Sequence, residues 1–333
     1  MKNLFRFGAQ QMDYITLGRT ELRVSVAGLG TGGFSRLGQE AGLSNDQSVT
    51  LVHRAIDLGV NFFDTAFTYR TEGILGTALK GVPRDSVVLS TKHVDHEVSA
   101  VRIVEALDNS LRDIGTDYLD VFHLHGVLPV HYDHAVDVLV PALMRERERG
   151  KFRYLGITER TSQDLQHHAL TRALTDKCWD VIMASFNMMH QGALSHVLPT
   201  AKRRGVGTLI MAPARCLVGS PDQLAQAIKA LAAQGKLPAV LGETDDPLAF
   251  LIHDRGAENL LDAAYRFARH VSGADVILFG TGNLAHLEDN IVSLLKPPLP
   301  RADVERLSAL FGHLKGIGLD QHPRAMKTPK FSA

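Results

Sequence analysis

Cysteine, net charge and long apolar runs are scarce or absent in this sequence of 333 residues. Its two cysteines, Cys178 and Cys216, are too few for a disulfide scaffold, so we expect free thiols and a cytoplasmic protein. Lys plus Arg and Asp plus Glu both total 36, so the net charge is zero and neither nucleic acid nor an anionic membrane is an expected partner. No apolar run reaches the roughly 18 residues of a membrane helix, and the N-terminus has no apolar centre of signal-peptide length.

The bulk composition is that of an ordinary globular protein. Hydrophobic residues make up 45% and charged residues 22% of the chain, which excludes disorder as its main state. The length fits two domains of average size or a single (β/α)8 barrel.

Short runs rich in β-forming residues alternate with longer runs that have helical periodicity. The expected strands span residues 26–30, 61–65, 87–92, 118–125, 154–158, 181–186, 207–212 and 276–280. The expected helices span residues 46–58, 72–79, 98–114, 135–149, 162–174, 193–204, 258–270 and 284–295. Parallel strands need a crossover, usually a helix, so this order predicts an α/β fold: a closed (β/α)8 TIM barrel in one domain over residues 1–333. An open doubly wound parallel sheet is the alternative.

Four segments lie outside these repeating units. Residues 14–24 read as an N-terminal β-hairpin around a glycine-containing turn. A long loop over 213–256, with one helical stretch at 223–233, is expected over the active-site face. An extra C-terminal helix is expected at 301–314, and the tail 322–333 is expected to be mobile.

Polar side chains stand at the carboxyl ends of three successive predicted strands, the end of a barrel where working residues gather. Asp64 ends the second strand and Lys92 the third, so we expect the two to meet and the lysine to stay charged despite partial burial. His123 and His125 lie two residues apart on the fourth strand and share one face. Tyr69 follows Asp64 on the next loop and can fold back over the group.

Each of these residues alone has a common structural explanation. A single Asp at a strand end is more often a turn or cap residue, a strand Lys is more often solvated, and a lone buried His is more often part of the core. A metal-dependent hydrolase could use His123, His125 and Asp64. Lys92 would place a like charge beside that metal and no third histidine ends a nearby strand, so we expect no metal site. The joint occurrence at consecutive strand ends favours a catalytic site.

Several spaced motifs resemble the aldo-keto reductase superfamily, from residue 14 to about residue 295. They are Leu-Gly-Val-Asn-Phe-Phe-Asp-Thr-Ala at 58–66, Gly-Ile-Leu-Gly-Thr-Ala-Leu at 73–79, Ser-Thr-Lys at 90–92, Asp-Tyr-Leu-Asp at 117–120, Gly-Lys-Phe-Arg-Tyr-Leu-Gly-Ile at 150–157 and Gly-Thr-Gly-Asn at 280–283. Within the superfamily the chain is most similar to the NAD-dependent L-galactose, L-fucose (D-threo-aldose) and pyridoxal dehydrogenase branch. The resemblance implies a barrel fold, an oxidoreductase activity and a nicotinamide cofactor.

The family's catalytic tetrad falls on Asp64, Tyr69, Lys92 and His125. The resemblance implies that Tyr69 donates or accepts the proton while the nicotinamide carries the hydride. Lys92, held by Asp64, would lower the tyrosine pKa from its usual value of about 10. His125 would hydrogen-bond the substrate oxygen, and Phe67 would form a wall of the substrate mouth.

The resemblance also implies a set of cofactor-binding positions. They are Thr158, Gly280, Thr281, Gly282, Asn283, Leu287 and Asn290. Members that prefer NADPH carry a lysine at the position of Gly280 and an arginine at that of His286, and both neutralise the 2′-phosphate. Neither fixed charge is present here, so NAD is expected, with NADP as the alternative.

On the nicotinamide side the sequence departs from the family pattern. The usual Ser-Asn pair is Thr158-Glu159, the usual Gln is Met183 and the usual stacking aromatic is Met211. Thr158 could still bond the carboxamide, but how the ring is held stays open.

The sequence therefore predicts an enzyme that uses NAD to oxidise a small polyhydroxylated aldehyde or lactol, such as an aldose or a pyridoxal-like compound. Gly126 stands where the family often has a tryptophan, and a mouth with few large aromatics suits a polyol. An NADPH-dependent aldehyde and ketone reductase of broad specificity is the main alternative, and a non-enzymatic redox sensor is another. The substrate, the physiological direction and the oligomeric state stay open.

Overall fold

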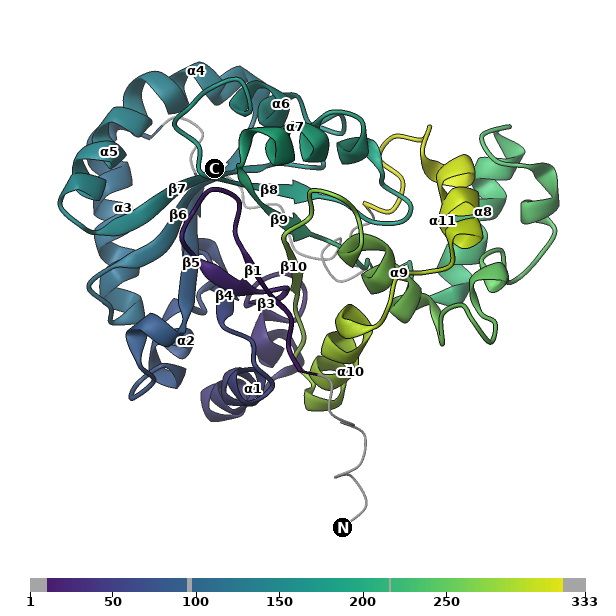
Figure 1. The fold of residues 1–333 in the computed structure, drawn as a ribbon, viewed down its shortest axis with the longest axis horizontal. Coiled ribbons are helices and arrows are strands. Elements are labelled where there is room, and N and C mark those ends of the chain that lie inside the picture. Colours follow the sequence, from purple (N-terminus) through teal and green to yellow (C-terminus); the bar gives the residue numbers. More distant parts are fainter. Residues whose placement is uncertain (1–10, 95–97, 216, 320–333) are drawn as a thin grey trace, which may run out of the picture.

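The computed structural model describes residues 11–94, 98–215 and 217–319. Within them, eight parallel strands close into a barrel in the order β10-β3-β4-β5-β6-β7-β8-β9, with helices around it (Figure 1). Strand β10 pairs with both β9 and β3, which excludes an open sheet, so the predicted (β/α)8 barrel is confirmed. Cys216 and the predicted tail 322–333 lie outside the described residues.

The barrel strands coincide with the runs predicted from the sequence, with shifts of one or two residues at their ends. They are β3 (Ala27–Gly30), β4 (Phe62–Asp64), β5 (Val88–Val94), β6 (Leu119–Val127), β7 (Phe152–Glu159), β8 (Val181–Ser185), β9 (Gly207–Met211) and β10 (Val276–Phe279).

The helices pack on the outside of the barrel. They are α1 (Asn45–Asp57), α2 (Glu72–Ala78), α3 (Ala100–Ile114), α4 (Tyr132–His134), α5 (Val140–Glu148), α6 (His168–Ala173), α7 (Val197–Arg204), α8 (Pro221–Ala233), α9 (Leu260–Arg269), α10 (Leu284–Leu295) and α11 (Arg301–Phe311). Short 3-10 turns are η1 (Arg36–Ala41), η2 (Phe67–Tyr69), η3 (Arg84–Ser86), η4 (Pro129–His131), η6 (Gly192–Leu194), η7 (Ala239–Gly242) and η8 (Ala249–Leu251), and η5 (Ala135–Leu139) is a π turn. None of the helices in the described residues combines the length and apolar character needed to cross a membrane.

Two predicted helices differ from the structure for local reasons. The predicted helix 135–149 contains the π turn η5, which ends two residues before Pro141, and proline has no N–H to continue the regular ladder. The predicted helix 162–174 begins only at His168. The Asp164 carboxylate accepts the backbone N–H groups of His168 and Ala169 there, at 2.9 and 2.8 Å, and so sets the start of α6.

The interior of the barrel is closed at its amino-terminal end by the predicted hairpin. Strands β1 (Tyr14–Thr16) and β2 (Arg23–Ser25) pair antiparallel, and the side chains around their turn join those that fill the barrel. At the turn, a Cβ atom on Gly18 would lie 2.2 Å from the nitrogen of Gly207, and Gly18 has φ of 52°. Only glycine fits this contact. The interior cluster consists of Leu17, Leu22, Val24, Phe62, Val88, Val121, Val181, Met183, Leu209, Val276 and Leu278.

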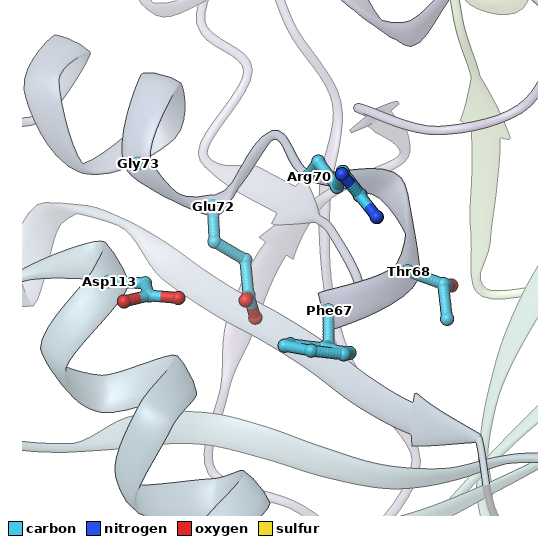
Figure 2. A pocket seen from close by; sticks show the side chains of 6 residues that line it. All are labelled: Phe67, Thr68, Arg70, Glu72, Gly73 and Asp113. Atoms are coloured by element: carbon cyan, nitrogen blue, oxygen red, sulfur yellow. The ribbon is translucent and has the colours of Figure 1, made fainter.

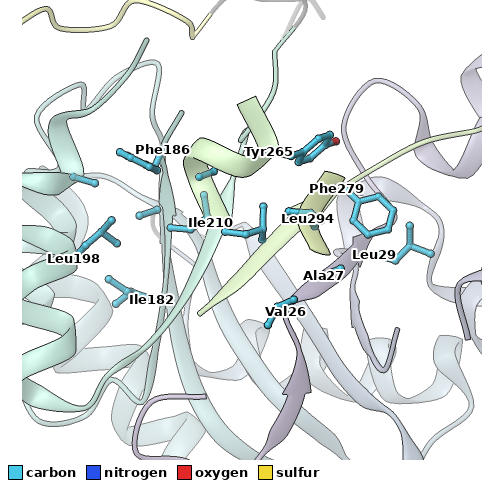
Figure 3. Close-up of a cluster of buried hydrophobic side chains, with 14 of the residues drawn as sticks. Val26, Ala27, Leu29, Ile182, Phe186, Leu198, Ile210, Tyr265, Phe279 and Leu294 are labelled. Atoms are coloured by element: carbon cyan, nitrogen blue, oxygen red, sulfur yellow. The ribbon is translucent and has the colours of Figure 1, made fainter. Parts of the chain in front are cut away.

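A second, larger core lies between the outer face of the sheet and the helices. Figure 3 shows part of it, where strand residues such as Ile182 and Ile210 lie near Leu198 and Leu294 of the helices. The strands are therefore covered on both faces, as expected for a parallel sheet.

Polar side chains lock the strands together in pairs at the amino-terminal rim. An Asp or Asn at or just before the start of β4, β6, β8 and β10 accepts a backbone N–H from the preceding barrel strand or, for β4, from Ser25 just before β3. The bonds join Asn61 to Ser25 N (2.7 Å), Asp120 to Leu89 N (2.9 Å), Asp180 to Leu155 N (3.1 Å) and Asp275 to Thr208 N (2.9 Å). These bonds satisfy backbone donors and fix the register of neighbouring strands.

The long segment 213–256 divides into two parts. Most of it, including α8, η7 and η8, packs with α11 at one edge of the molecule: the Arg306 guanidinium lies 3.9 Å from the ring centre of Phe250, and His313 Nε2 lies 3.2 Å from the Lys236 carbonyl oxygen (Figure 1). Its start reaches a loop at the carboxyl ends of the strands, where the Arg215 guanidinium lies 5.8 Å from the ring centre of Phe34.

We expect Asp120→Ala to lower the free energy of unfolding by about 2–4 kcal/mol in chemical denaturation. The substitution removes the acceptor of the Leu89 N–H and leaves Arg84 and Arg153, at 2.8 and 3.2 Å, without their carboxylate. Asp85→Ala, at an exposed acid next to Arg84, is the control and should change stability by less than about 0.5 kcal/mol. Equal losses in the two variants would contradict the role of the rim.

Candidate active site

A buried ion pair lies at the carboxyl ends of β4 and β5. Asp64 is the last residue of β4 and stands opposite Ser90 in the sheet, so Lys92 is two residues further along and on the same face. Lys92 Nζ donates to Asp64 Oδ2 at 2.5 Å and to the Thr65 carbonyl oxygen at 2.8 Å, and the Ser90 hydroxyl donates to Asp64 Oδ1 at 2.9 Å. Lys92 is 1% and Asp64 3% exposed. The meeting of these two side chains is as the sequence predicted.

Tyr69 and His125 complete a group of four side chains. The Tyr69 ring, on η2, has its centre 5.1 Å from Lys92 Nζ and 5.8 Å from that of His125, edge-on at 90°. Gly32 lies against the ring, because a Cβ atom there would be 2.3 Å from it. The structure thus brings together Asp64, Tyr69, Lys92 and His125.

Burial and the charge of Lys92 act in opposite directions on the Tyr69 pKa. Burial raises the Tyr69 pKa; Lys92 lowers it, but not enough to offset burial, and Asp64 raises it further. Burial also opposes the charge on Lys92, yet Asp64 and Tyr69 outweigh burial, so the lysine pKa is raised. The predicted effect of Lys92 is therefore present, but burial, which cannot be read from the motif, outweighs it.

His123 is a core residue. Its ring fills the space over Gly156, where a Cβ atom would lie 2.1 Å from Nδ1, and its Nε2 lies 3.1 Å from the Ser90 hydroxyl oxygen. Burial, then the positive charge of Lys92 and the nearby His125, hold the His123 pKa well below its usual value, so the ring is neutral. The part of the chain that the structure describes contains no group of three or more His, Cys, Asp or Glu arranged to hold a metal.

The predicted nicotinamide side contains Thr158 and, next to it, a contact between Glu159 and His167 that the sequence did not predict. Thr158 is buried on β7, and its hydroxyl oxygen accepts the Gly126 N–H at 2.7 Å, which leaves the hydroxyl hydrogen to donate. Glu159 accepts the Ser185 N–H at 2.8 Å, and its other oxygen lies 2.7 Å from Nδ1 of His167. Burial is the main reason that the Glu159 pKa is raised, and His167 opposes it. The signal in the sequence is a carboxylate at a strand end, which needs a partner.

The turn between β10 and α10 holds most of the other predicted cofactor residues. The Thr281 hydroxyl oxygen accepts the Asn283 N–H at 3.0 Å, and the Asn283 side chain caps α10 by accepting the N–H groups of Ala285 and His286 at 2.8 and 3.2 Å. Gly280 is exposed and Leu287 is buried in the core. Asn290 is 4% exposed, and within the described residues its Oδ1 has no hydrogen-bond partner.

A cavity of about 590 Å³ lies beside η2. Phe67, the predicted wall of the mouth, is 44% exposed and lines it, and Figure 2 shows Glu72 lying near this ring. The Glu72 carboxylate accepts the Thr91 hydroxyl at 2.6 Å, and burial is the main cause of its raised pKa. Glu72 was not among the site residues predicted from the sequence. The remaining lining residues are Thr68, Arg70, Gly73 and Asp113.

Known proteins show similarity over most of the chain. The sequence model of the Aldo/keto reductase family matches residues 28–311. L-galactose dehydrogenase from Arabidopsis thaliana is 34% identical over 208 residues, which are 59% of this chain and 64% of that protein. Aldo-keto reductase YhdN from Bacillus subtilis (strain 168) is 26% identical over 211 residues, which are 60% of this chain and 61% of that protein. The chain thus spans less than two thirds of the length of either relative.

Solved structures support the same fold. Aldo-keto reductase AKR11C1 from Bacillus halodurans superposes in its holo form with a TM-score of 0.70 at 20% identity, covering 90% of this chain and 97% of that one. Its apo form gives 0.67 at 23% identity, covering 90% and 96%. Because the family model spans the barrel from β3 to α11, the chain belongs to the Aldo/keto reductase family.

Proposed function

We propose that this protein is a nicotinamide-dependent oxidoreductase that transfers a hydride between its cofactor and a small polyhydroxylated aldehyde or lactol. The observation that carries the proposal is the buried pair of Lys92 and Asp64 next to Tyr69 and His125. A buried lysine that keeps its charge beside a tyrosine ring is an arrangement suited to proton transfer.

In this proposal Tyr69 moves the proton and the nicotinamide, when bound, supplies or accepts the hydride. The charge of Lys92 favours the ionised form of Tyr69 and so offsets part of the cost of burying it. Asp64 keeps Lys92 charged and in place through a 2.5 Å contact. His125, whose ring is edge-on to the tyrosine ring, would bond the same substrate oxygen.

The residues present fit a nicotinamide adenine dinucleotide. The unpartnered Oδ1 of buried Asn290 is an acceptor for the amino group of adenine. The Thr158 hydroxyl, whose hydrogen is available, is a donor to the carboxamide. The turn residues Thr281, Gly282 and Asn283, with Leu287 below them, would hold the adenosine phosphate.

The turn before α10 supports NAD rather than NADP. The N–H groups of Asn283, Ala285 and His286 already bond Thr281 and Asn283, so they are not free for a 2′-phosphate. Gly280 brings no charge, and an exposed histidine, His286, stands where members that prefer NADPH carry an arginine. An NADPH-dependent carbonyl reductase remains the alternative function.

The substrate class rests on two points. The name of the Arabidopsis relative specifies a sugar, L-galactose, and that relative is 34% identical over the matched part. The second point is that Gly126 stands where the family often has a tryptophan, and a mouth with few large aromatics suits a polyol.

Tyr69→Phe should abolish most turnover, by on the order of a hundredfold or more, because the proton donor and acceptor is lost. NAD affinity, measured by calorimetry, should change little, since the phenol hydroxyl is not needed to bind the dinucleotide. Tyr118→Phe, at a tyrosine near the amino-terminal rim, is the matched control and should keep full activity. Full activity in Tyr69→Phe would overturn the proposed mechanism.

The rate of alcohol or lactol oxidation should rise with pH from neutral into the alkaline range. Tyr69 must lose its proton to act as the base, and burial raises its pKa. In the double variant Lys92→Met, Asp64→Asn the alkaline limb should move to higher pH, because Lys92 is the larger of the two charge effects on Tyr69. If the activity left in the double variant had the same pH profile as the wild type, Lys92 and Asp64 would have no influence on the ionisation of Tyr69.

Calorimetry with the purified protein should show tighter binding of NAD than of NADP. His286→Arg adds a fixed charge at an exposed position of the turn and should improve NADP affinity by roughly tenfold, with little effect on NAD. Tighter NADP binding by the wild type would favour the reductase alternative.

A further inference from the structure

The loop after β3 has an unusual backbone. Arg36, Leu37 and Gly38 are three consecutive residues with positive φ, at 42°, 55° and 88°. The left-handed conformation costs a non-glycine residue roughly 1–2 kcal/mol, and such residues persist only where the surroundings determine them.

Contacts on two sides hold this loop in place. Leu37 is fully buried, and its carbonyl oxygen accepts the hydroxyl of Ser48 on α1 at 2.7 Å. On the other side, Gly38 touches the β10–α10 turn so closely that a Cβ atom on Gly282 would lie 2.5 Å from the Gly38 Cα. The loop is therefore clamped between α1 and the turn that we expect to hold the cofactor.

The clamped loop holds the backbone of Tyr69. Arg36 Nε donates to the Tyr69 carbonyl oxygen at 2.9 Å, while Nη1 of the same guanidinium donates to Glu40 at 2.8 Å. Gly32, at the start of the loop, lies against the face of the tyrosine ring. A single segment, residues 32–36, thus contacts Tyr69 at both its carbonyl oxygen and its ring.

The backbone at Arg70, the residue after Tyr69, explains why Tyr69 needs these contacts. Arg70 also has a positive φ, 57°, and ends the short turn η2. Tyr69 itself is held in the turn by a bond from its N–H to the Ala66 carbonyl oxygen at 2.9 Å. A three-residue turn that ends in a strained residue has little stability of its own, so its position depends on neighbours.

We propose that Arg36 is a positioning residue for Tyr69, which sets the place of the phenol hydroxyl by fixing the Tyr69 carbonyl to the clamped loop. The inference rests on the proposed function for its effect on turnover, but the placement of the ring can be measured without any substrate. A displacement of about 1 Å in a reacting group lowers the rate by up to a hundredfold. Loss of the Arg36–Tyr69 bond would therefore lower turnover if it moved the phenol hydroxyl by this distance.

The test compares Arg36→Met, Arg36→Lys and Glu40→Gln with the wild type. Arg36→Met removes the donor to Tyr69 but keeps an unbranched side chain that reaches the position of Nε. Arg36→Lys keeps the charge but lacks Nε, so it can bond Tyr69 or Glu40 but not both in the present geometry, and it carries the same test should the Met variant fail to fold. Glu40→Gln weakens only the ion pair, whose carboxylate is half exposed, and is the matched control.

At a substrate concentration that saturates the wild type, Arg36→Met should lower kcat by on the order of ten- to a hundredfold. Its KM and its affinity for NAD should stay within about threefold of the wild-type values. Arg36→Lys should fall between, and Glu40→Gln should match the wild type. Unchanged kcat in Arg36→Met, or an equal loss in Glu40→Gln, would overturn the inference.

A second measurement separates this inference from the proposed function. The chain has six tyrosines, so fluorine NMR of protein labelled with 3-fluorotyrosine gives few resonances, and Tyr69→Phe identifies the one of interest. The Tyr69 resonance should shift or split in Arg36→Met and stay in place in Glu40→Gln, whether or not any sugar is oxidised. An unmoved resonance in Arg36→Met would refute the positioning role even if the enzyme proves active.

Discussion

The buried pair of Lys92 and Asp64 is the constraint on which the candidate site depends. An ammonium group that is 1% exposed keeps its charge only with a carboxylate in contact, and removing either partner would leave the other charge buried alone. The pair forms because β4 and β5 align Asp64 with Ser90 and place Lys92 two residues beyond. A slip of one residue would turn Lys92 into the helix layer, so the chemistry of the mouth depends on strand register.

The register is held at the opposite end of the barrel. The side chains of Asn61, Asp120, Asp180 and Asp275 join the strands two by two, and the hairpin closes the space between them. Stability is therefore concentrated at the amino-terminal rim, while the carboxyl ends carry loops with positive φ such as those at Arg36, Arg70 and His167. The same arrangement is general in (β/α)8 barrels: residues at the amino-terminal face stabilise the fold, and residues at the opposite face carry out the chemistry.

The sequence was most informative where local chemistry and periodicity agree. The strand order and the meeting of Asp64 and Lys92 follow from apolar runs that end in a polar residue. Three features could not be read in this way: the Glu159–His167 contact, the Tyr69 pKa and the left-handed backbone at Arg36. Each depends on how deeply a group is buried or on a neighbour distant in the chain, and neither quantity is encoded in a local pattern.

The contact of Gly18 with Gly207 has a consequence for how the protein is made. The hairpin leaves the ribosome before the barrel strands, yet the part of β9 that it contacts is synthesised only after most of the barrel. Leu17, Leu22 and Val24 must therefore wait as exposed apolar groups until the barrel is nearly complete. The hairpin can therefore close the amino-terminal end of the barrel only after β9 has been synthesised.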